Sequence, residues 1–239
     1  MNLAIDIGNS LTKAGIFEQG VLQHSISCKD LSPGLLHSLQ RDYPVKGCIV
    51  SSVGRLPDHI ASGFDPGFPF IELNSQTKVP FVNLYATPQT LGNDRRALAT
   101  GGMTKFPGNN VLVIGLGTAI TYDFLDRDKN YHGGAISPGL QLRLKSLNTF
   151  TENLPLINHN EFQGYIGRTT SQSIAAGVME GINGELKHLI KLYNDNFSPL
   201  KVILTGGDAK YFDKNLKNNI FVIPNLVLVG LNKILEFNA

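Results

Sequence analysis

The chain has 239 residues, of which 42% are hydrophobic and 17% charged, and its formal net charge is +2. Such a length permits one large domain or two of about 120 residues, each with its own core. The charge is too small for a nucleic-acid-binding surface, and no segment approaches the ~20 apolar residues of a membrane span. We therefore expect a soluble globular protein with neither a nucleic-acid nor a membrane partner.

The start of the chain and its two cysteines bear on its location. Met1 is followed by Asn-Leu-Ala-Ile-Asp, a strand-like start without the basic and apolar regions of a signal peptide. Cys28 and Cys48 have the spacing of neither a disulfide framework nor a zinc site. We expect a cytoplasmic protein whose thiols are buried or incidental.

The spacing of apolar residues in the first 53 residues predicts a hairpin, then a helix, then a strand. Residues 3–17 predict a hairpin with a polar tip at residues 8–10. Leucines at helical spacing predict an amphipathic helix over 30–43, and residues 47–53 read as a buried strand.

A second strand-turn-strand pattern begins about 110 residues after the first. Residues 111–125 repeat the plan of the first hairpin, with a Gly-Leu-Gly-Thr turn at 115–118. Two such hairpins, each opening a half of the chain, indicate an internal duplication of the fold. We expect two domains, 1–110 and 111–239.

The last third of the chain predicts a long helix, a strand and a closing helix. In residues 170–193 six apolar side chains share one helical face, and Gly177, Gly181 and Gly184 suggest close packing. Residues 201–205 predict a strand, and a helix follows from Leu226. The six apolar residues are Ile174, Val178, Ile182, Leu186, Leu189 and Ile190.

The polar turn of the first hairpin is suited to binding phosphate. Small residues let the backbone approach anionic oxygens, and Asp6 could hold Mg²⁺ beside them. A plain turn whose asparagine serves only its conformation is equally compatible. The candidate phosphate-binding residues are Asp6, Ile7, Gly8, Asn9, Ser10, Leu11, Thr12 and Lys13.

Two further glycine-bearing turns follow strands. In residues 115–121 the glycines leave room for phosphates and Thr118 could donate to one of them. Gly206 and Gly207, after the strand at 201–205, could lie against adenine or ribose. Each turn alone is a weak signal, because glycine turns are common.

Taken in order, the three turns resemble the phosphate 1, phosphate 2 and adenosine segments of the actin, Hsp70 and sugar kinase superfamily. The resemblance implies an α/β protein of two duplicated ribonuclease-H-like domains, the actin-like ATPase fold, with the active site in the cleft between them.

Within that superfamily the chain is similar to the type III pantothenate kinases over almost its whole length. Residues 6–10 resemble the family's Asp-x-Gly-Asn-Thr/Ser opening, and residues 92–95 its Gly-x-Asp-Arg signature. Tyr85, the Gly-Gly-x-Ile-x-Pro-Gly block at 133–139 and the Gly-x-x-Thr segment at 167–170 also correspond.

The resemblance implies an ATP-dependent kinase that converts pantothenate to 4′-phosphopantothenate in the first step of coenzyme A biosynthesis. Asp94 would be the general base, and Thr170 would reach pantothenate bound mainly to the neighbouring subunit of a homodimer. The residues lining the pantothenate pocket would be Tyr85, Gly92, Asn93, Asp94 and Arg95.

Each of these residues also has a purely structural interpretation. Asp94 could form an exposed ion pair with Arg95 or Arg96. Tyr85 could be a packed aromatic residue. Thr170 could be the N-cap of the following helix, with Ser171 as the competing candidate.

The chain departs from the family at Gly115, where the family usually has an aspartate associated with a monovalent cation, potassium or ammonium. Asp123 lies on the same face of its strand but farther from the turn, so it is not an obvious replacement. We therefore expect ATP with Mg²⁺ as cofactor and leave the potassium site open.

Two other functions remain compatible with the sequence. Gly115 favours a nucleotide-binding regulatory homologue that no longer catalyses. A kinase of another small alcohol, such as a sugar, is disfavoured by the short chain and the Gly-x-Asp-Arg signature.

Overall fold

The computed structural model describes residues 1–158, 164–212 and 220–239. The chain gathers into two compact units, one of residues 1–109, 123–133 and 225–239 and one of residues 110–122 and 134–224. The domain boundaries expected from the sequence, 1–110 and 111–239, stay a prediction. In the described part of the chain, no helix is both long and apolar enough to span a membrane.

A five-stranded sheet forms the centre of the first unit, in the order β3-β2-β1-β4-β5. Strand β1 pairs antiparallel with β2 and parallel with β4. The hairpin expected at 3–17 and the strand expected at 47–53 are confirmed. The strands are β1 (Asn2–Ile7), β2 (Thr12–Glu18), β3 (Val21–Cys28), β4 (Gly47–Ser52) and β5 (Phe70–Glu72).

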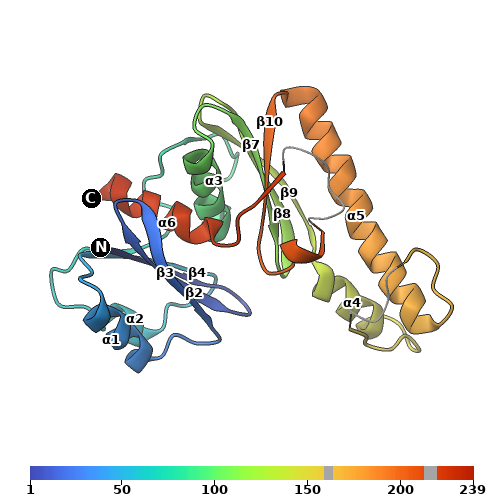
Figure 1. Cartoon of the computed structure of the whole chain (residues 1–239), viewed down its shortest axis with the longest axis horizontal. Helices are drawn as coiled ribbons and strands as arrows, with labels where there is room; N and C mark the ends of the chain where they lie inside the picture. The colour runs from blue at the N-terminus through green and yellow to red at the C-terminus, as the bar shows by residue number, and fades with distance from the viewer. Residues whose placement is uncertain (159–163, 213–219) are drawn as a thin grey trace. The chain divides into compact units, whose positions relative to one another are not determined.

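Helices cover both faces of this sheet (Figure 1). Because side chains alternate along β1, Leu3 and Ile5 pack with Leu36 of α1 (Pro33–Asp42), next to α2 (Asp58–Ala61). The other face contacts α6 (Leu226–Asn238), which packs tightly on α3 (Asn93–Lys105). A Cβ on Gly230 of α6 would lie 1.8 Å from the Ala97 carbonyl oxygen, so only glycine permits this approach.

The helix expected at 30–43 is confirmed, and it begins at Pro33. The Ser32 hydroxyl accepts a hydrogen bond from the Leu35 N–H at 3.3 Å and caps the helix. Both cysteines are free, Cys48 buried and Cys28 half-buried, as expected.

The second sheet has the order β11-β10-β7-β8-β9-β6. Five of its strands, β9-β8-β7-β10-β11, repeat the arrangement β3-β2-β1-β4-β5, and β10 is parallel to β7 as β4 is to β1. The duplication inferred from two hairpins is therefore confirmed. The strands are β6 (Val82–Asn83), β7 (Asn110–Leu116), β8 (Ala119–Leu125), β9 (Asn130–Pro138), β10 (Leu200–Thr205) and β11 (Ile220–Val222).

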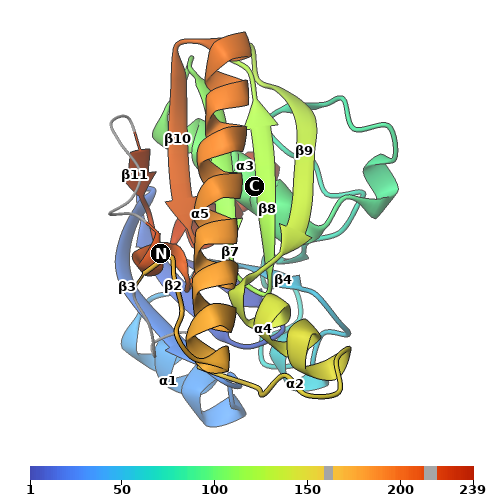
Figure 2. The same cartoon turned by 90° about the vertical axis from the view of Figure 1, so that its right-hand side faces the viewer.

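The long helix α5 (Thr170–Phe197) lies along β10 and β7 (Figure 2). It extends four residues beyond the expected end, and Ile174, Val178, Ile182 and Leu186 are buried. Leu189 and Ile190 are half-buried. The unit also contains α4 (Leu140–Thr149) and a short 3₁₀ turn, η3 (Ala209–Tyr211).

The expectation of close packing at the three glycines of α5 is wrong. All three are exposed, and a Cβ added to Gly177 or Gly184 would meet nothing within 4 Å. At Gly181 the nearest atom is Arg143 Nη1, at 3.7 Å. These glycines form a stripe beside the buried face rather than within it, a distinction that depends on how the helix is rotated against its sheet.

Candidate active site

Asp6 lies one residue before the end of β1, beside Lys13 of β2 and Ser51 of β4 in the strand register. Burial raises its pKa to about 6, and the charge of Asp94 adds to the rise. Lys13 and the Ser51 hydroxyl oppose that shift. The structure thus brings Asp6 and Asp94, 88 residues apart in sequence (94 minus 6), into one electrostatic environment.

The turn after β1 is closed by the Gly8 N–H, which donates to the Leu11 carbonyl at 3.1 Å. Asn9, Ser10 and Leu11 are exposed there and can meet a ligand. Thr12 differs, because its side chain is buried and its hydroxyl donates to the Lys29 carbonyl at 3.4 Å. The Thr12 hydroxyl is engaged inside the unit.

Asp94 lies in the first turn of α3, two residues after the N-cap residue Gly92. Its Oδ1 accepts the Arg95 N–H at 2.8 Å. A Cβ on Gly92 would lie 2.5 Å from that oxygen, so a side chain there would displace the carboxylate. This contact explains why a glycine precedes the aspartate at this spacing.

The exposed ion pair considered for Asp94 is not formed. Arg95 and Arg96 are buried, with 5% and 4% of their surface exposed. No ion pair joins Asp94 to either arginine in the described residues. The half-buried Asp94 carboxylate is therefore not neutralised by its sequence neighbours.

Arg95 binds a carboxylate of the protein itself. Its Nε donates to Asp123 Oδ1 at 2.8 Å, and the Tyr131 hydroxyl donates to the same oxygen at 2.7 Å. Burial raises the pKa of the fully buried Asp123 to about 6, against the lowering effect of the Arg95 charge. This partner of Arg95 was not predicted from the sequence, although an aspartate in the apolar strand 119–125 needs a cation nearby.

Tyr85 is half-buried, and its ring takes part in an aromatic group. The Arg95 guanidinium carbon lies 5.6 Å from the centre of the Tyr85 ring, and the Tyr131 ring lies 6.3 Å away. A Cβ on Gly133, whose φ is +93°, would lie 2.9 Å from Tyr85 Cδ2. Gly133 therefore makes room for the tyrosine, which is packed on one side and accessible on the other.

A cavity of about 370 Å³ opens beside Asp94. Amides, hydroxyls and one carboxylate line it together with two apolar side chains, and none of these lining residues is cationic. Such a lining suits a neutral group that carries hydroxyls and small apolar substituents. Its lining residues are Ser52, Val53, Asn74, Ser75, Gln89, Leu91, Gly92, Asn93 and Asp94.

The sequence analysis predicted three of these lining residues: Gly92, Asn93 and Asp94. The rest come from the end of β4, the turn at 74–77 and the 3₁₀ turn η1 (Pro88–Thr90). No local pattern marks them, because only the folded chain brings these segments to Asp94.

In the second unit the turn between β7 and β8 consists of Gly117 and Thr118, shorter than the expected 115–118. A Cβ on Gly139 would lie 2.0 Å from the Gly117 carbonyl oxygen, and the Gly139 N–H donates to the Thr118 carbonyl at 3.0 Å. A Cβ on Gly206, whose φ is +96°, would lie 2.2 Å from the Leu116 carbonyl oxygen. Three glycine-bearing segments therefore meet at the end of β7, where Thr118 is exposed.

Thr170 is the first residue of α5 and is exposed. The N-cap is Thr169, whose hydroxyl accepts the Gln172 N–H at 3.2 Å, so both N-cap candidates, Thr170 and Ser171, were wrong by one or two residues. With the cap made by its neighbour, Thr170 lines a groove of about 600 Å³ that also contains Arg143.

The described residues contain no cluster of three or more His, Cys, Asp or Glu side chains arranged to hold a metal. The fit to Mg²⁺ therefore depends on the Asp6 and Asp94 carboxylates. Their proximity raises the pKa of Asp6, and a divalent cation prefers such oxygen donors. The pair fits a metal held chiefly by the phosphates of a nucleotide.

Solved structures support the fold. A Campylobacter jejuni protein described as a Baf-family transcriptional activator aligns with a TM-score of 0.62 and 21% identity, over 99% of this chain and 98% of the other. A ROK-family glucokinase from Streptomyces griseus, solved with glucose and AMPPNP, aligns with a TM-score of 0.55 and 10% identity, over 99% and 98%. At these identities the likeness concerns the fold alone, and the expected fold class is confirmed.

Sequence comparison identifies the family. The family model for type III pantothenate kinase matches residues 2–192. A type III pantothenate kinase of Christiangramia forsetii is 42% identical over 240 residues, covering 100% of this chain and 99% of that protein. One from Phocaeicola vulgatus is 44% identical over 239 residues, with the same shares covered. The chain belongs to the type III pantothenate kinase family.

Proposed function

We propose that this chain transfers the γ-phosphoryl group of ATP to the primary hydroxyl of pantothenate, forming 4′-phosphopantothenate in the first step of coenzyme A biosynthesis. One observation carries the proposal beyond family membership: the Asp94 carboxylate lies at a cavity of hydroxyl- and amide-bearing side chains, close enough to Asp6 for its charge to raise the pKa of Asp6. This placement suits a base that must meet an alcohol close to bound phosphates.

In this mechanism Asp94 accepts the proton of the primary hydroxyl while the hydroxyl oxygen attacks the γ-phosphorus and ADP leaves. The neutral pantoyl part, with its hydroxyls and methyl groups, fits the cavity at Asp94. Gly92 leaves room for the carboxylate, because a Cβ there would lie 2.5 Å from Asp94 Oδ1. The proposed substrate-binding residues are Tyr85, Gly92, Asn93, Asp94, Arg95 and Thr170.

The phosphates are bound, in our proposal, by the turn at 8–11 together with Asp6, Ile7, Thr12, Lys13 and Thr118. The exposed amides of this turn offer donors to anionic oxygens. Thr12 contributes by its backbone, because its hydroxyl is engaged with Lys29. Mg²⁺ bound with ATP beside Asp6 would supply positive charge that offsets the charge of the phosphates.

Gly115 offers no side-chain oxygen, so we propose that the chain lacks the carboxylate of the family's monovalent-cation site. Activity should then not depend on potassium through this position. We further propose a cytoplasmic homodimer in which Thr170 reaches pantothenate bound mainly to the neighbouring subunit. The exposure of Thr170 beside a groove supports that last assignment.

A coupled ADP-release assay with ATP and Mg²⁺, with and without pantothenate, tests the function. Pantothenate-dependent release is expected, and Asp94→Asn should lower kcat by about 10²–10⁴, the usual contribution of a general base. Asp128→Asn, the same change at an exposed site, is the control. Binding of ATP without any release would favour the regulatory alternative.

A further inference from the structure

The buried Asp123 connects several of the proposed substrate-binding residues. Its carboxylate, with 0% of its surface exposed, accepts hydrogen bonds from Arg95 Nε at 2.8 Å and from the Tyr131 hydroxyl at 2.7 Å. The Arg95 side chain is 6% exposed, so this ion pair is shielded from water on both sides. Breaking a pair of this kind costs far more than breaking one at a surface.

From Arg95 the connection reaches Asp94 and Tyr85. The Arg95 N–H donates to Asp94 Oδ1, so the place of Arg95 in α3 also determines where the Asp94 carboxylate lies. The Arg95 guanidinium lies over the Tyr85 ring. Tyr131, which donates to Asp123, packs beside the same ring.

We propose that Asp123 is a positioning residue for the pantothenate site. By holding Arg95 it fixes the start of α3 and, with it, the position of the Asp94 carboxylate. By holding Arg95 and Tyr131 it also fixes the two groups that pack against the Tyr85 ring. Asp123 itself is fully buried and does not touch the substrate. The inference rests on the proposed function, because it assigns Asp123 to the same reaction.

Loss of the Asp123 carboxylate should change the kinetic parameters for pantothenate more than the KM for ATP. The start of α3 lines the cavity at Asp94, and Tyr85 is a proposed substrate-binding residue. The phosphate-binding turn at 8–11, by contrast, has no contact with Asp123 among the bonds described for it. A displacement of about 1 Å in a reacting group costs about 100-fold in rate. The selectivity between the two substrates separates positioning from a general loss of structure.

The experiment measures kcat, the KM for pantothenate and the KM for ATP in Asp123→Asn, together with thermal unfolding. The asparagine keeps the volume and removes the charge that holds Arg95. We expect kcat/KM for pantothenate to fall by about 10²-fold, and the KM for ATP to change by less than about twofold. Tyr131→Phe removes one hydrogen bond to Asp123 and should give a smaller selective loss, about 3- to 10-fold.

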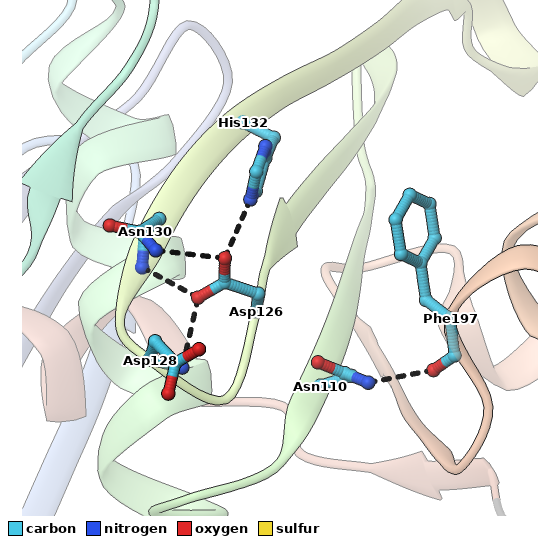
Figure 3. Close-up of polar contacts among 6 residues, drawn as sticks. All are labelled: Asn110, Asp126, Asp128, Asn130, His132 and Phe197. Atoms are coloured by element: carbon cyan, nitrogen blue, oxygen red, sulfur yellow. Dashed lines mark hydrogen bonds and ion pairs between the residues drawn. The ribbon is translucent and has the colours of Figure 1, made fainter.

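Asp126→Asn is the matched control, because Asp126 lies three residues further along the chain and is also a carboxylate with several partners. It accepts hydrogen bonds from the Asp128 and Asn130 N–H groups, the Asn130 side chain and His132 Nε2, at 2.8 to 2.9 Å (Figure 3). None of these residues belongs to the proposed site. Asp126→Asn should lower the unfolding temperature and leave the kinetic parameters unchanged.

Each outcome bears on the inference. Equal effects of Asp123→Asn on pantothenate and ATP, or kinetics like those of Asp126→Asn, would overturn it. If Asp123→Asn does not fold, Tyr131→Phe decides by the same comparison of substrates. A wild-type chain without pantothenate-dependent ADP release would overturn the proposed function itself, and the inference with it.

Discussion

The two central hairpins of the molecule have the same place in their sheets and different chemistry. Asp6 lies one residue before the end of β1 and pairs with Ser51 of β4, whereas Gly115 lies one residue before the end of β7 and pairs with Thr205 of β10. The first position carries a carboxylate with a raised pKa, and the second carries no side chain. Equivalent positions of the same topology therefore carry a charged side chain in one hairpin and only backbone in the other.

The surroundings of the two positions differ in the same way. Near Asp6 the ionisable groups Lys13 and Asp94 gather. Around the end of β7 the close contacts involve Gly117, Gly139 and Gly206, whose missing side chains let backbone segments approach each other. Charge in the first unit suits metal and proton transfer, and bare backbone in the second suits the approach of a nucleotide.

Among changes to the two hairpins, the largest effect should come from Asp6→Asn, which removes the carboxylate that distinguishes the first hairpin. We expect kcat to fall by about 100-fold or more, because the anionic oxygen donor proposed for the Mg²⁺ bound with the phosphates is lost. The unfolding free energy should rise by up to about 3 kcal/mol at pH 8, since the folded-state pKa of about 6 exceeds the ordinary 3.8 and ionisation therefore opposes folding.

The pH dependence checks the sign of this effect. As pH falls through about 6, Asp6 of the wild-type protein takes up a proton. The unfolding free energy of the wild type should then approach that of Asp6→Asn, and the two should be equal below pH 3.8. Thermal unfolding of both proteins from pH 8 to pH 4 measures it. An Asp6→Asn protein less stable than wild type at pH 8 would show that the carboxylate is compensated in the fold.

Gly115→Asp would make the second hairpin like the first. The position is buried within β7, and burying a charged carboxylate is costly, so we expect a loss of about 3 kcal/mol in unfolding free energy. Gly115→Ala, which adds a methyl group without charge, should cost much less. Chemical denaturation compares the two, and equal losses would point to lack of space rather than to charge.

Gly139→Ala tests the close backbone contact in the second hairpin. The added Cβ would lie 2.0 Å from the Gly117 carbonyl oxygen, so α4 or the turn at 117–118 must move. We expect a higher KM for ATP and a loss of about 2 kcal/mol in stability. Gly177→Ala is the control: nothing lies within 4 Å of its Cβ, and alanine in a helix should add about 0.5–1 kcal/mol.

The smallest effect is expected when potassium replaces sodium in the assay buffer. Because Gly115 supplies no side-chain oxygen ligand, pantothenate-dependent rates in potassium and sodium buffers of equal ionic strength should agree within about twofold. A strong preference for potassium would show that other oxygens of the chain, or water, hold the cation.

Much of this protein could be read from local patterns in its sequence. The spacing of apolar residues, which differs between helix and strand, predicted both hairpins, helices at 30–43 and 170–193 and a strand at 201–205. The structure has these elements at 33–42, 170–197 and 200–205. The turns that end β1, β7 and β10 could be found because glycine and small polar residues mark them. The signature at 92–95 likewise located Asp94.

Only the tertiary structure decided which residues meet. Arg95 and Asp123 are 28 residues apart, and no pattern in either segment predicts that the two side chains form an ion pair. Ser52, Asn74 and Gln89 join Asp94 at one cavity from three separate segments. The glycines of α5 had the spacing of a packed stripe and yet face outward. A local pattern records the periodicity of one element, whereas contacts depend on how elements far apart in the chain are packed together.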